Sequence, residues 1–379
     1  MTRDTPLDNA KRARRALRIT VVGAGAIGGT LAVRLACAGH MVSVLTRGAT
    51  LKALHEGPAS LSDLDGMHQA RLAAYDSAPH VEDGAVVMRE ASAAAIGPQD
   101  LVITAVKAHA LPGVASMVPP LLGKGTRVMP LVNGVPWWYF QGMGTHGADA
   151  ATVHTTKPHA MIARPIAALD PEGLLARCIA PERIVGAVVY MTGHTPSAGV
   201  YVANNPHRLI IGGIGETDDV GHDGDASTEM SLFCIAAGFN DAGIVTHRSA
   251  NIRADIWAKL AGNLTSNPLS VLTGATLEQI YGEPDLLLTV RPMLQEIRAL
   301  SKALSVSLPF EDDAFLARCR GMGAVKTSML QDAERGRPLE MGAIGDAVLE
   351  LATRADVAMP VTTSVLGLVR RHVSSAPRP

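Results

Sequence analysis

Residues 18–48 read RITVVGAGAIGGTLAVRLACAGHMVSVLTRG, and this stretch decides the fold class of the first part of the chain. An apolar β-branched run, a glycine turn, an apolar-periodic helix ending near Gly39 and a second apolar run follow one another. This order predicts a βαβ unit whose two strands are buried, as a parallel sheet requires. Further strands are expected at 100–106 and 127–132, with a helix-length segment around 108–124 between them. We therefore predict a doubly wound α/β sheet.

The glycine turn has the spacing GxGxxG, formed by Gly23, Gly25 and Gly28. The first glycine permits the tight turn, the second lets the backbone approach a pyrophosphate, and the third lets helix and strand pack closely. The anion would then meet the free N–H groups of the helix start at Ala26 and Ile27. The turn predicts a Rossmann-type dinucleotide-binding domain, and a plain βα turn is the alternative.

The second strand ends at Thr46 and Arg47, where an Asp or Glu would hold the ribose 2′-hydroxyl of NAD. An arginine at this place can instead pair with a 2′-phosphate. The sequence therefore favours NADP over NAD, with a solvated surface role for Arg47 as the alternative.

Composition excludes several classes of protein. The chain has 379 residues and 47% apolar composition, which suits two domains, and its 34 Lys and Arg balance 35 Asp and Glu. This balance gives no reason to expect nucleic acid or an anionic membrane as partner. Four scattered cysteines predict a reduced, cytoplasmic protein, and no apolar run is long enough to span a bilayer.

The organisation along the chain predicts two domains after a polar tail. The tail covers 1–17 and lacks the apolar core of a secretory signal. The dinucleotide-binding domain is expected over 18–247, with an insertion at about 144–181, and a mostly α-helical domain over 248–379. Within the first domain, strand patterns at 183–191, 199–205 and 208–213 suggest an antiparallel extension of the sheet.

An apolar helical segment, residues 253–274, carries Lys259, Asn263 and Asn267 at intervals of four. Such side chains drift slowly around one helix face and remain neighbours. The residues between them are small or apolar, which favours a binding face over a solvated one. A partly buried lysine can act as general acid towards a carbonyl oxygen and stabilise the oxyanion, so we expect this face to meet the cofactor across an interdomain cleft.

Two further candidates follow predicted parallel strands. Lys107 comes after the strand at 100–106 and Asn133 after the strand at 127–132, at the carboxyl edge where such folds bind ligands. An exposed loop cation and a simple Asn-Gly turn are the alternatives. Later, Ser328 and Glu340 lie in a segment that chemistry alone would describe as a helix and a turn.

The chain resembles the ketopantoate reductase (2-dehydropantoate 2-reductase) family from about Arg18 to Arg371. The motifs that carry the resemblance are GAGAIGG, AVKAHA, LVNGVPWW, RADIWAKLAGNLTSNPLS and KTSMLQDAERGRPLE. The resemblance implies that Lys259 is the catalytic acid and that Glu340 contacts the reacting oxygen. It further implies substrate binding by Asn133, Asn263, Asn267 and Ser328, and cofactor contacts by Asn133, Lys107 and Arg47.

The resemblance implies NADPH-dependent reduction of a 2-oxo acid, with 2-dehydropantoate as the expected substrate and pantoate as the product, and it leaves a homodimer open. Two positions depart from the family pattern, since Leu277 and Val325 stand where asparagines are expected. A same-fold reductase of a bulkier carbonyl or imine is therefore one alternative. A non-catalytic NADP-binding sensor is the other.

Overall fold

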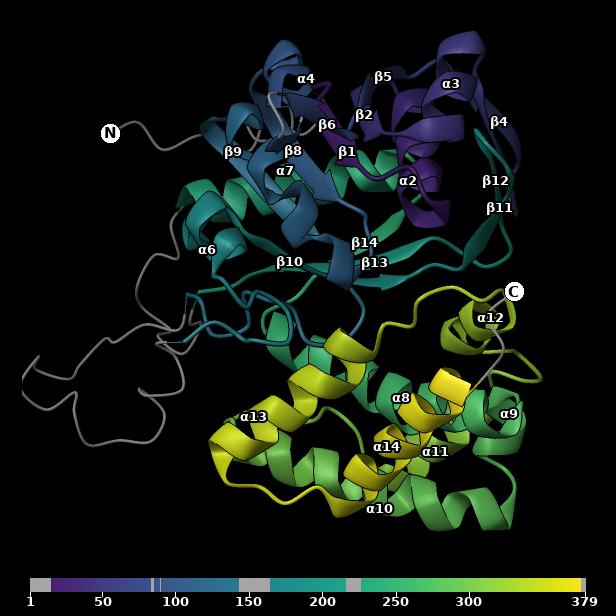
Figure 1. The fold of residues 1–379 in the computed structure, drawn as a ribbon. Coiled ribbons are helices and arrows are strands. Elements are labelled where there is room, and N and C mark those ends of the chain that lie inside the picture. Colours follow the sequence, from purple (N-terminus) through teal and green to yellow (C-terminus); the bar gives the residue numbers. More distant parts are fainter. Residues whose placement is uncertain (1–14, 83–84, 89, 143–163, 216–225, 376–379) are drawn as a thin grey trace, which may run out of the picture. The chain divides into compact units, whose positions relative to one another are not determined.

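The computed structural model describes residues 15–82, 85–88, 90–142, 164–215 and 226–375. The chain forms two compact units (Figure 1). The first comprises Met1–Val132, Gln141–Gly144 and Gly173–Ile252, and the second comprises Asn133–Phe140, Thr145–Glu172 and Arg253–Pro379. Most of the predicted tail, and the 144–163 part of the predicted insertion, lie outside the described residues. The short segment Asn133–Phe140 packs with the second unit, although the prediction had placed it in the first domain.

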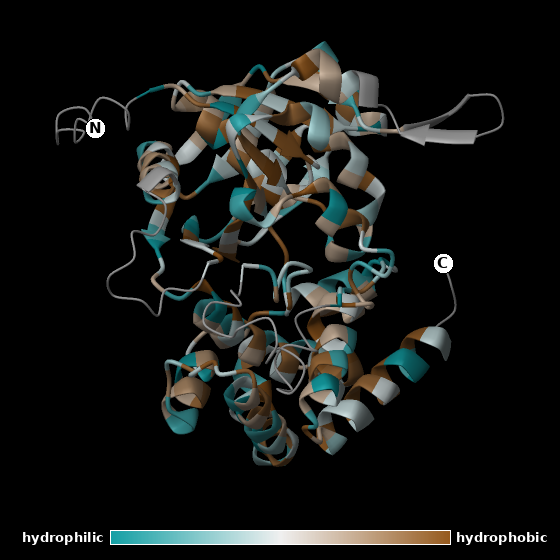
Figure 2. Cartoon of the chain, turned by 90° about the vertical axis from the view of Figure 1, so that its left-hand side faces the viewer, coloured by the Kyte–Doolittle hydropathy of each residue, from teal (hydrophilic) through white to brown (hydrophobic). Residues whose placement is uncertain are grey.

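A five-stranded parallel sheet runs through the first unit, and brown, hydrophobic strands are visible in the middle of that unit in Figure 2. In spatial order its strands are β5 (Ala73–Asp76), β2 (Met41–Thr46), β1 (Arg18–Val22), β8 (Gln99–Thr104) and β9 (Leu122–Pro130). Val21 of the central strand is paired with Val44 and Ile103, and all three are fully buried. The predicted doubly wound α/β sheet is confirmed, because continuous apolar runs leave both faces of these strands to be covered.

The first helices of this unit are α2 (Ala26–Cys37), α3 (Gly48–Glu56) and α4 (Glu90–Ile96). The helix predicted around 108–124 is wrong. Three short 3₁₀ helices stand there instead, η1 (Ala108–Ala110), η2 (Pro112–Met117) and η3 (Pro119–Leu121). Prolines at the starts of η2 and η3 prevent a continuous α-helix, because proline has no N–H group to donate within a helix.

The strand patterns after residue 182 form two sheets, so the predicted single extension is wrong in part. Their strands are β10 (Val185–Tyr190), β13 (Arg208–Gly213) and β14 (Val245–Arg248) in one sheet, and β11 (Gly193–Ser197), β12 (Val200–Ala203), β3 (Ala59–Asp63) and β4 (Gly66–Ala70) in the other. β10 and β13 are antiparallel as predicted, but β14 joins β13 in parallel. β12 pairs instead with β11 and β3, whose half-exposed, polar sequences gave no strand signal.

A buried carboxylate ties α2 to the four-stranded sheet. Asp63, at the end of β3, accepts hydrogen bonds from Arg34 Nε and His207 Nε2, both at 2.8 Å. Burial alone would raise the pKa of Asp63, but the bonds from His207 and the Asp65 backbone, together with the charge of Arg34, outweigh it and hold the pKa below its usual 3.8. The folded first unit therefore favours an ionised Asp63.

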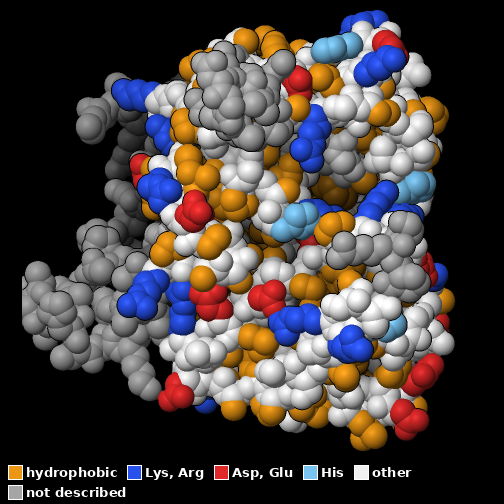
Figure 3. Space-filling model, viewed as in Figure 1, with side chains coloured by type: hydrophobic (Ala, Val, Ile, Leu, Met, Phe, Trp, Pro, Cys, Tyr) orange, Lys and Arg blue, Asp and Glu red, His pale blue; other side chains and the backbone are white. Residues whose placement is uncertain are grey.

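The remaining elements of the first unit are β6 (Pro79–Glu82), β7 (Ala85–Met88), α6 (Leu174–Cys178), η4 (Pro181–Arg183) and α7 (Ala226–Asp241). Of these, α7 packs against β13 and β14. On the face of the molecule that Figure 3 shows, basic and acidic side chains are interspersed.

The second unit is helical, as predicted. Its helices are α8 (Ile252–Thr273), α9 (Leu277–Ile280), α10 (Pro284–Ala303), α11 (Asp312–Arg320), α12 (Ser328–Glu334), α13 (Ala347–Ala355) and α14 (Pro360–Ser375). In α10, Val290, Met293, Ile297 and Leu300 recur at helical spacing and are all buried. Within the described ranges, no helix is long and apolar enough to cross a membrane.

Candidate active site

Lys259, Asn133 and Glu340 form a hydrogen-bonded chain inside the second unit. Lys259 Nζ donates to Asn133 Oδ1 at 2.8 Å, and Asn133 Nδ2 donates to Glu340 Oε2 at 3.3 Å. All three side chains are partly buried. The two charges fix the orientation of the amide, because its oxygen must face the ammonium and its nitrogen the carboxylate. Glu340 therefore reaches the lysine through an asparagine rather than by a direct ion pair.

The electrostatics of this chain give Lys259 an accessible proton. Burial lowers the pKa of Lys259 to about 8, although the Glu340 carboxylate acts in the opposite direction. A lysine in water has a pKa near 10.5 and releases its proton reluctantly at neutral pH. A value near 8 would leave the side chain mostly protonated at pH 7, which suits the general-acid role predicted for it.

The Asn-Gly turn that carries Asn133 is fixed by close backbone contact. Gly134 has φ +88°, and a Cβ at this position would lie 2.2 Å from the carbonyl oxygen of Ala343. Val135 N donates to the same oxygen at 2.9 Å. Ala343 belongs to a π-helix, Gly342–Asp346, that begins two residues after Glu340. Such irregular turns are frequent at functional sites, and here the π-helix holds Asn133 and Glu340 in one arrangement.

The predicted substrate residues lie along α8 and at the start of α12. Asn263 is partly buried and Asn267 almost fully buried, one and two turns after Lys259. Ser328 is the first residue of α12 and is exposed. The structure thus places Lys259, Asn263 and Asn267 on successive turns of one helix, as predicted.

Sequence reasoning missed the two residues that tie α12 to α8. Thr327 caps α12 by accepting a hydrogen bond from Leu330 N at 3.1 Å, and its hydroxyl shares a 2.6 Å hydrogen bond with Ser270. Both side chains are buried, and Ser270 lies three residues after Asn267. The Thr-Ser pair before an apolar run was a helix-cap signal that could have indicated Thr327. Ser328 is consequently held at the end of α8 that carries Asn267.

The glycine turn of the first unit has the shape that a dinucleotide needs. Gly23 has φ +100°, and a Cβ there would lie 2.6 Å from Val106. A Cβ on Gly28 would lie 2.0 Å from the Gly23 carbonyl oxygen, so helix and strand touch. A Cβ on Gly25, by contrast, would meet open space. Together these positions fit the three roles predicted for them.

The start of α2 is suited to an anion. Helix α2 begins at Ala26, with Ile27 next, and Gly25 caps it without a side-chain hydrogen bond. No acidic residue stands in the first turn to compete for its N–H groups. The residues present therefore fit a pyrophosphate.

Arg47 and Lys107 lie at the same edge of the parallel sheet as the glycine turn. Arg47 is exposed and follows β2, whereas Lys107 is partly buried and follows β8. Since β2 and β8 flank β1, the carboxyl ends of all three strands meet at one edge. The roles assigned to both cations remain predictions.

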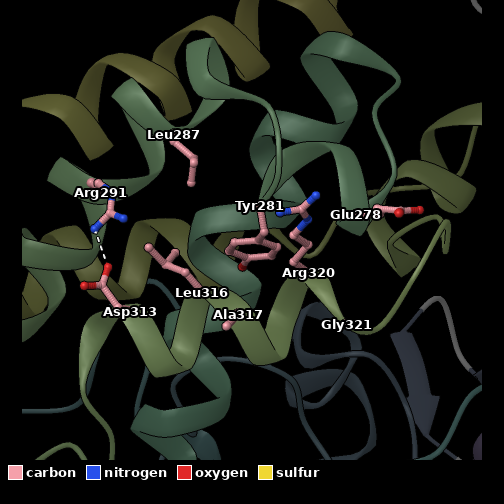
Figure 4. A pocket seen from close by; sticks show the side chains of 9 residues that line it. All are labelled: Glu278, Tyr281, Leu287, Arg291, Asp313, Leu316, Ala317, Arg320 and Gly321. Carbon is pink, nitrogen blue, oxygen red and sulfur yellow. Dashed lines mark ion pairs between the residues drawn. The ribbon is translucent and has the colours of Figure 1, made fainter.

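A separate cavity of about 450 Å³ opens between α9, α10 and α11 (Figure 4). It is lined by Glu278, Tyr281, Leu287, Arg291, Asp313, Leu316, Ala317, Arg320 and Gly321. None of the predicted site residues lines this cavity. The Tyr281 hydroxyl hydrogen-bonds the Gly262 carbonyl oxygen at 3.1 Å and the Thr265 hydroxyl at 2.8 Å, so this residue packs against α8.

Comparison with known families gives matches to both parts of the chain. The family model described as ketopantoate reductase PanE/ApbA matches residues 19–136, and the model of its C-terminal part matches residues 251–373. A 2-dehydropantoate 2-reductase of Mesorhizobium japonicum is 36% identical over 360 residues, which cover 94% of this chain and 97% of that protein.

Solved structures give the same result. A protein of Ralstonia solanacearum MolK2, assigned as a ketopantoate reductase, is 37% identical with a TM-score of 0.78, over 95% of this chain and 99% of that one. A 2-dehydropantoate 2-reductase of Geobacter metallireducens has a TM-score of 0.72 at 24% identity, over 94% of this chain and 99% of that one, and shares the fold.

Proposed function

Because the chain belongs to the ketopantoate reductase family, we propose that it reduces 2-dehydropantoate to pantoate with NADPH. The observation that carries the proposal is the hydrogen-bonded chain of Lys259, Asn133 and Glu340. A part-buried ammonium held by an amide suits the reduction of a carbonyl, because the carbonyl oxygen becomes negative during the reaction.

Lys259 acts as the general acid. Bound NADPH supplies the hydride that the carbonyl carbon accepts. As the oxygen gains charge, the Lys259 ammonium stabilises it and transfers a proton from Nζ, giving the hydroxyl group of the product. Asn133 holds Nζ in place through its 2.8 Å hydrogen bond, and Glu340 fixes the asparagine amide. We assign Glu340 a further contact, with the hydroxyl group that forms from the carbonyl oxygen.

The remaining polar side chains of the second unit hold the acid. Asn263 and Asn267 offer amide N–H groups on successive turns after Lys259, and Ser328 offers an exposed hydroxyl at the start of α12. Amide and hydroxyl groups can hold the substrate carboxylate by hydrogen bonds. The carboxylate then does not have to form an ion pair with Lys259, which the reaction needs at the carbonyl oxygen. We assign Asn263, Asn267 and Ser328 to the carboxylate and hydroxyl end of the substrate.

The first unit holds the cofactor. The glycine turn and the N–H groups of Ala26 and Ile27 would bind the pyrophosphate, and Lys107 would lie on the cofactor side. Arg47 would pair with the 2′-phosphate, because no acidic residue ends β2 to hold a 2′-hydroxyl instead. All four cysteines lie within the described residues and none forms a disulfide, which fits the reducing cytoplasm, where we place the protein. A homodimer stays a prediction, to be tested by light scattering.

A bulkier 2-oxo acid is the second candidate substrate. Leu277 and Val325 replace expected asparagines, and the backbone N–H of Leu277 donates to the Val325 carbonyl oxygen at 2.9 Å. The two apolar side chains therefore belong to neighbouring segments, and Val325 is exposed. If they border the bound substrate, they favour an apolar group over a polar one.

The test is a comparison of 2-oxo acids at fixed NADPH, followed by loss of nicotinamide absorbance. The proposal expects the highest kcat/KM for 2-dehydropantoate. A higher value for a bulkier acid would favour the second candidate. Tight NADPH binding without turnover of any carbonyl or imine would instead indicate a sensor.

A further inference from the structure

The segment that carries Asn133 is anchored to α8 a second time, at Tyr139. Trp257 Nε1 donates a hydrogen bond to Tyr139 Oη at 2.7 Å. Both side chains are almost completely buried: Tyr139 is 1% exposed and Trp257 0%, and their rings meet edge to face. A hydrogen bond removed from water in this way is costly to break, because either partner alone would leave a buried polar atom unsatisfied.

The backbone of Tyr139 is held as well. Its carbonyl oxygen accepts a hydrogen bond from Arg253 Nε at 3.0 Å, and the Arg253 guanidinium lies 6.0 Å from the centre of the Tyr139 ring. Arg253 is buried and stands one helical turn before Trp257. One residue of the segment thus receives a hydrogen bond from each of two successive turns of α8.

This anchor lies on a different side of α8 from the lysine. Trp257 and Lys259 are two residues apart, which places their side chains about 200° apart around a helix. The segment meets α8 at both places, since Asn133 contacts Lys259 and Tyr139 contacts Trp257. The segment is therefore held to α8 near both of its ends, and a shift of the end at Tyr139 would move Asn133 relative to the ammonium.

We propose that Tyr139 is a positioning residue for the reaction: its hydrogen bond with Trp257 holds the segment Asn133–Phe140 so that Asn133 Oδ1 faces the Lys259 ammonium. The kinetic part of this inference rests on the proposed function. Burial raises the pKa of Tyr139 to about 12, so the phenol stays neutral across the range in which Lys259 titrates. A change in the pH profile of a variant would therefore not reflect loss of a tyrosine charge.

The test compares Tyr139→Phe with a matched control, Tyr281→Phe. Tyr281 is also a buried tyrosine whose hydroxyl bonds to α8, at Thr265 and Gly262, but its ring meets Phe315 rather than the Asn133 segment. Both variants lose one buried hydroxyl, and Tyr281→Phe, which loses two hydrogen bonds, should lose at least as much thermal stability as Tyr139→Phe. We expect kcat to fall roughly 10- to 100-fold in Tyr139→Phe only, as misplacement of a catalytic group does, with NADPH affinity unchanged in both.

Trp257→Phe removes the same hydrogen bond from its other side, because phenylalanine lacks the indole N–H donor. It should reduce kcat like Tyr139→Phe, and the double variant should be no slower than the slower single variant, because both remove one hydrogen bond. Circular dichroism verifies that each variant is folded. Additive losses in the double variant would contradict the proposal.

A readout without turnover separates this inference from the proposed function. Acetic anhydride acetylates only neutral amines, so mass spectrometry of the Lys259 peptide across pH reports protonation of that lysine. We expect half-maximal labelling to move to higher pH in Tyr139→Phe, because a loosened segment admits water to the ammonium, and to stay unchanged in Tyr281→Phe. An unchanged labelling curve in Tyr139→Phe would overturn the inference even if the enzyme turns over, and a shifted curve would support it even if no substrate is found.

Discussion

Replacement of Glu340 by glutamine tests the electrostatics of the site directly. The carboxylate raises the pKa of Lys259 against the effect of burial, so its removal should lower that pKa from about 8. Two hydrogen bonds with an amide between them allow the charges to be at most roughly 8 Å apart, which corresponds to at least about 2 kcal/mol at an effective dielectric constant near 20. Since 1.36 kcal/mol corresponds to one pKa unit, we expect the pKa of Lys259 to fall by roughly one and a half or more.

The assay is the pH dependence of kcat for NADPH oxidation with a saturating 2-oxo acid. A general acid must be protonated, so activity is present below the pKa of Lys259 and is lost as the pH rises through it. The wild-type rate should decline above about pH 8, and the decline should begin at lower pH in Glu340→Gln. Asn133→Asp should do the opposite, because it places a negative charge beside the ammonium.

The control is Glu334→Gln, which removes a carboxylate of the same unit that pairs with Lys326 on the surface. Its pH profile should match that of the wild type. A decline in Glu340→Gln that coincides with the wild-type curve would show that the carboxylate does not act on Lys259. A shift to higher pH would refute the sign of the argument.

Three further predictions follow from the two units. Lys259→Ala should reduce turnover by roughly 10² or more, since an acid and an oxyanion partner are lost together, while fluorescence titration should find NADPH affinity nearly unchanged; near-normal turnover would remove the lysine from the chemistry. Arg47→Ala should weaken binding of NADPH much more than that of NADH in the same titration, and equal effects would contradict the phosphate assignment. Asp63→Asn should lower the free energy of unfolding by about 3 kcal/mol at pH 7, because it breaks a buried charge pair with Arg34. Since the pKa of Asp63 is lowered on folding, its contribution is present above pH 3.8 and is lost as the pH falls through the folded value, so urea titrations should find the variant and the wild type converging at low pH.

The parallel sheet could be predicted from the sequence because its strands are buried on both faces. Continuous apolar runs such as ITVV and LVIT, bounded by turn residues, are typical of strands in such a sheet. The strands β3, β4 and β11 carry Ser, His, Gln and Thr, and their pairing depends on partners up to about 140 residues away. Nothing local distinguishes them from loops. The helix predicted around 108–124 was wrong because Pro112, Pro119 and Pro120 interrupt that segment.

The sequence allowed the residues of the candidate site to be predicted, but not the contacts between them. Spacing alone placed Lys259, Asn263 and Asn267 on successive turns of one helix, because helix geometry is local. The bond between Lys259 and Asn133 joins residues 126 positions apart, and no periodicity reports such a pairing. The π-helix after Glu340 was equally invisible, since its Ala343 carbonyl oxygen bonds the N–H group of Val135, far away in the sequence.

In the proposed reaction, the asparagine between the two charges is what would let Lys259 serve as the acid. A carboxylate in direct contact with the ammonium would stabilise the charged form strongly and hold the proton on nitrogen. An amide between the two groups weakens that attraction through distance, so burial dominates and the pKa of Lys259 settles near 8. The same amide still orients Nζ through a 2.8 Å hydrogen bond. Under the proposed function, Asn133 therefore separates two tasks that a direct ion pair would combine: it positions the acid, and it keeps the carboxylate far enough away for burial to set the strength of that acid.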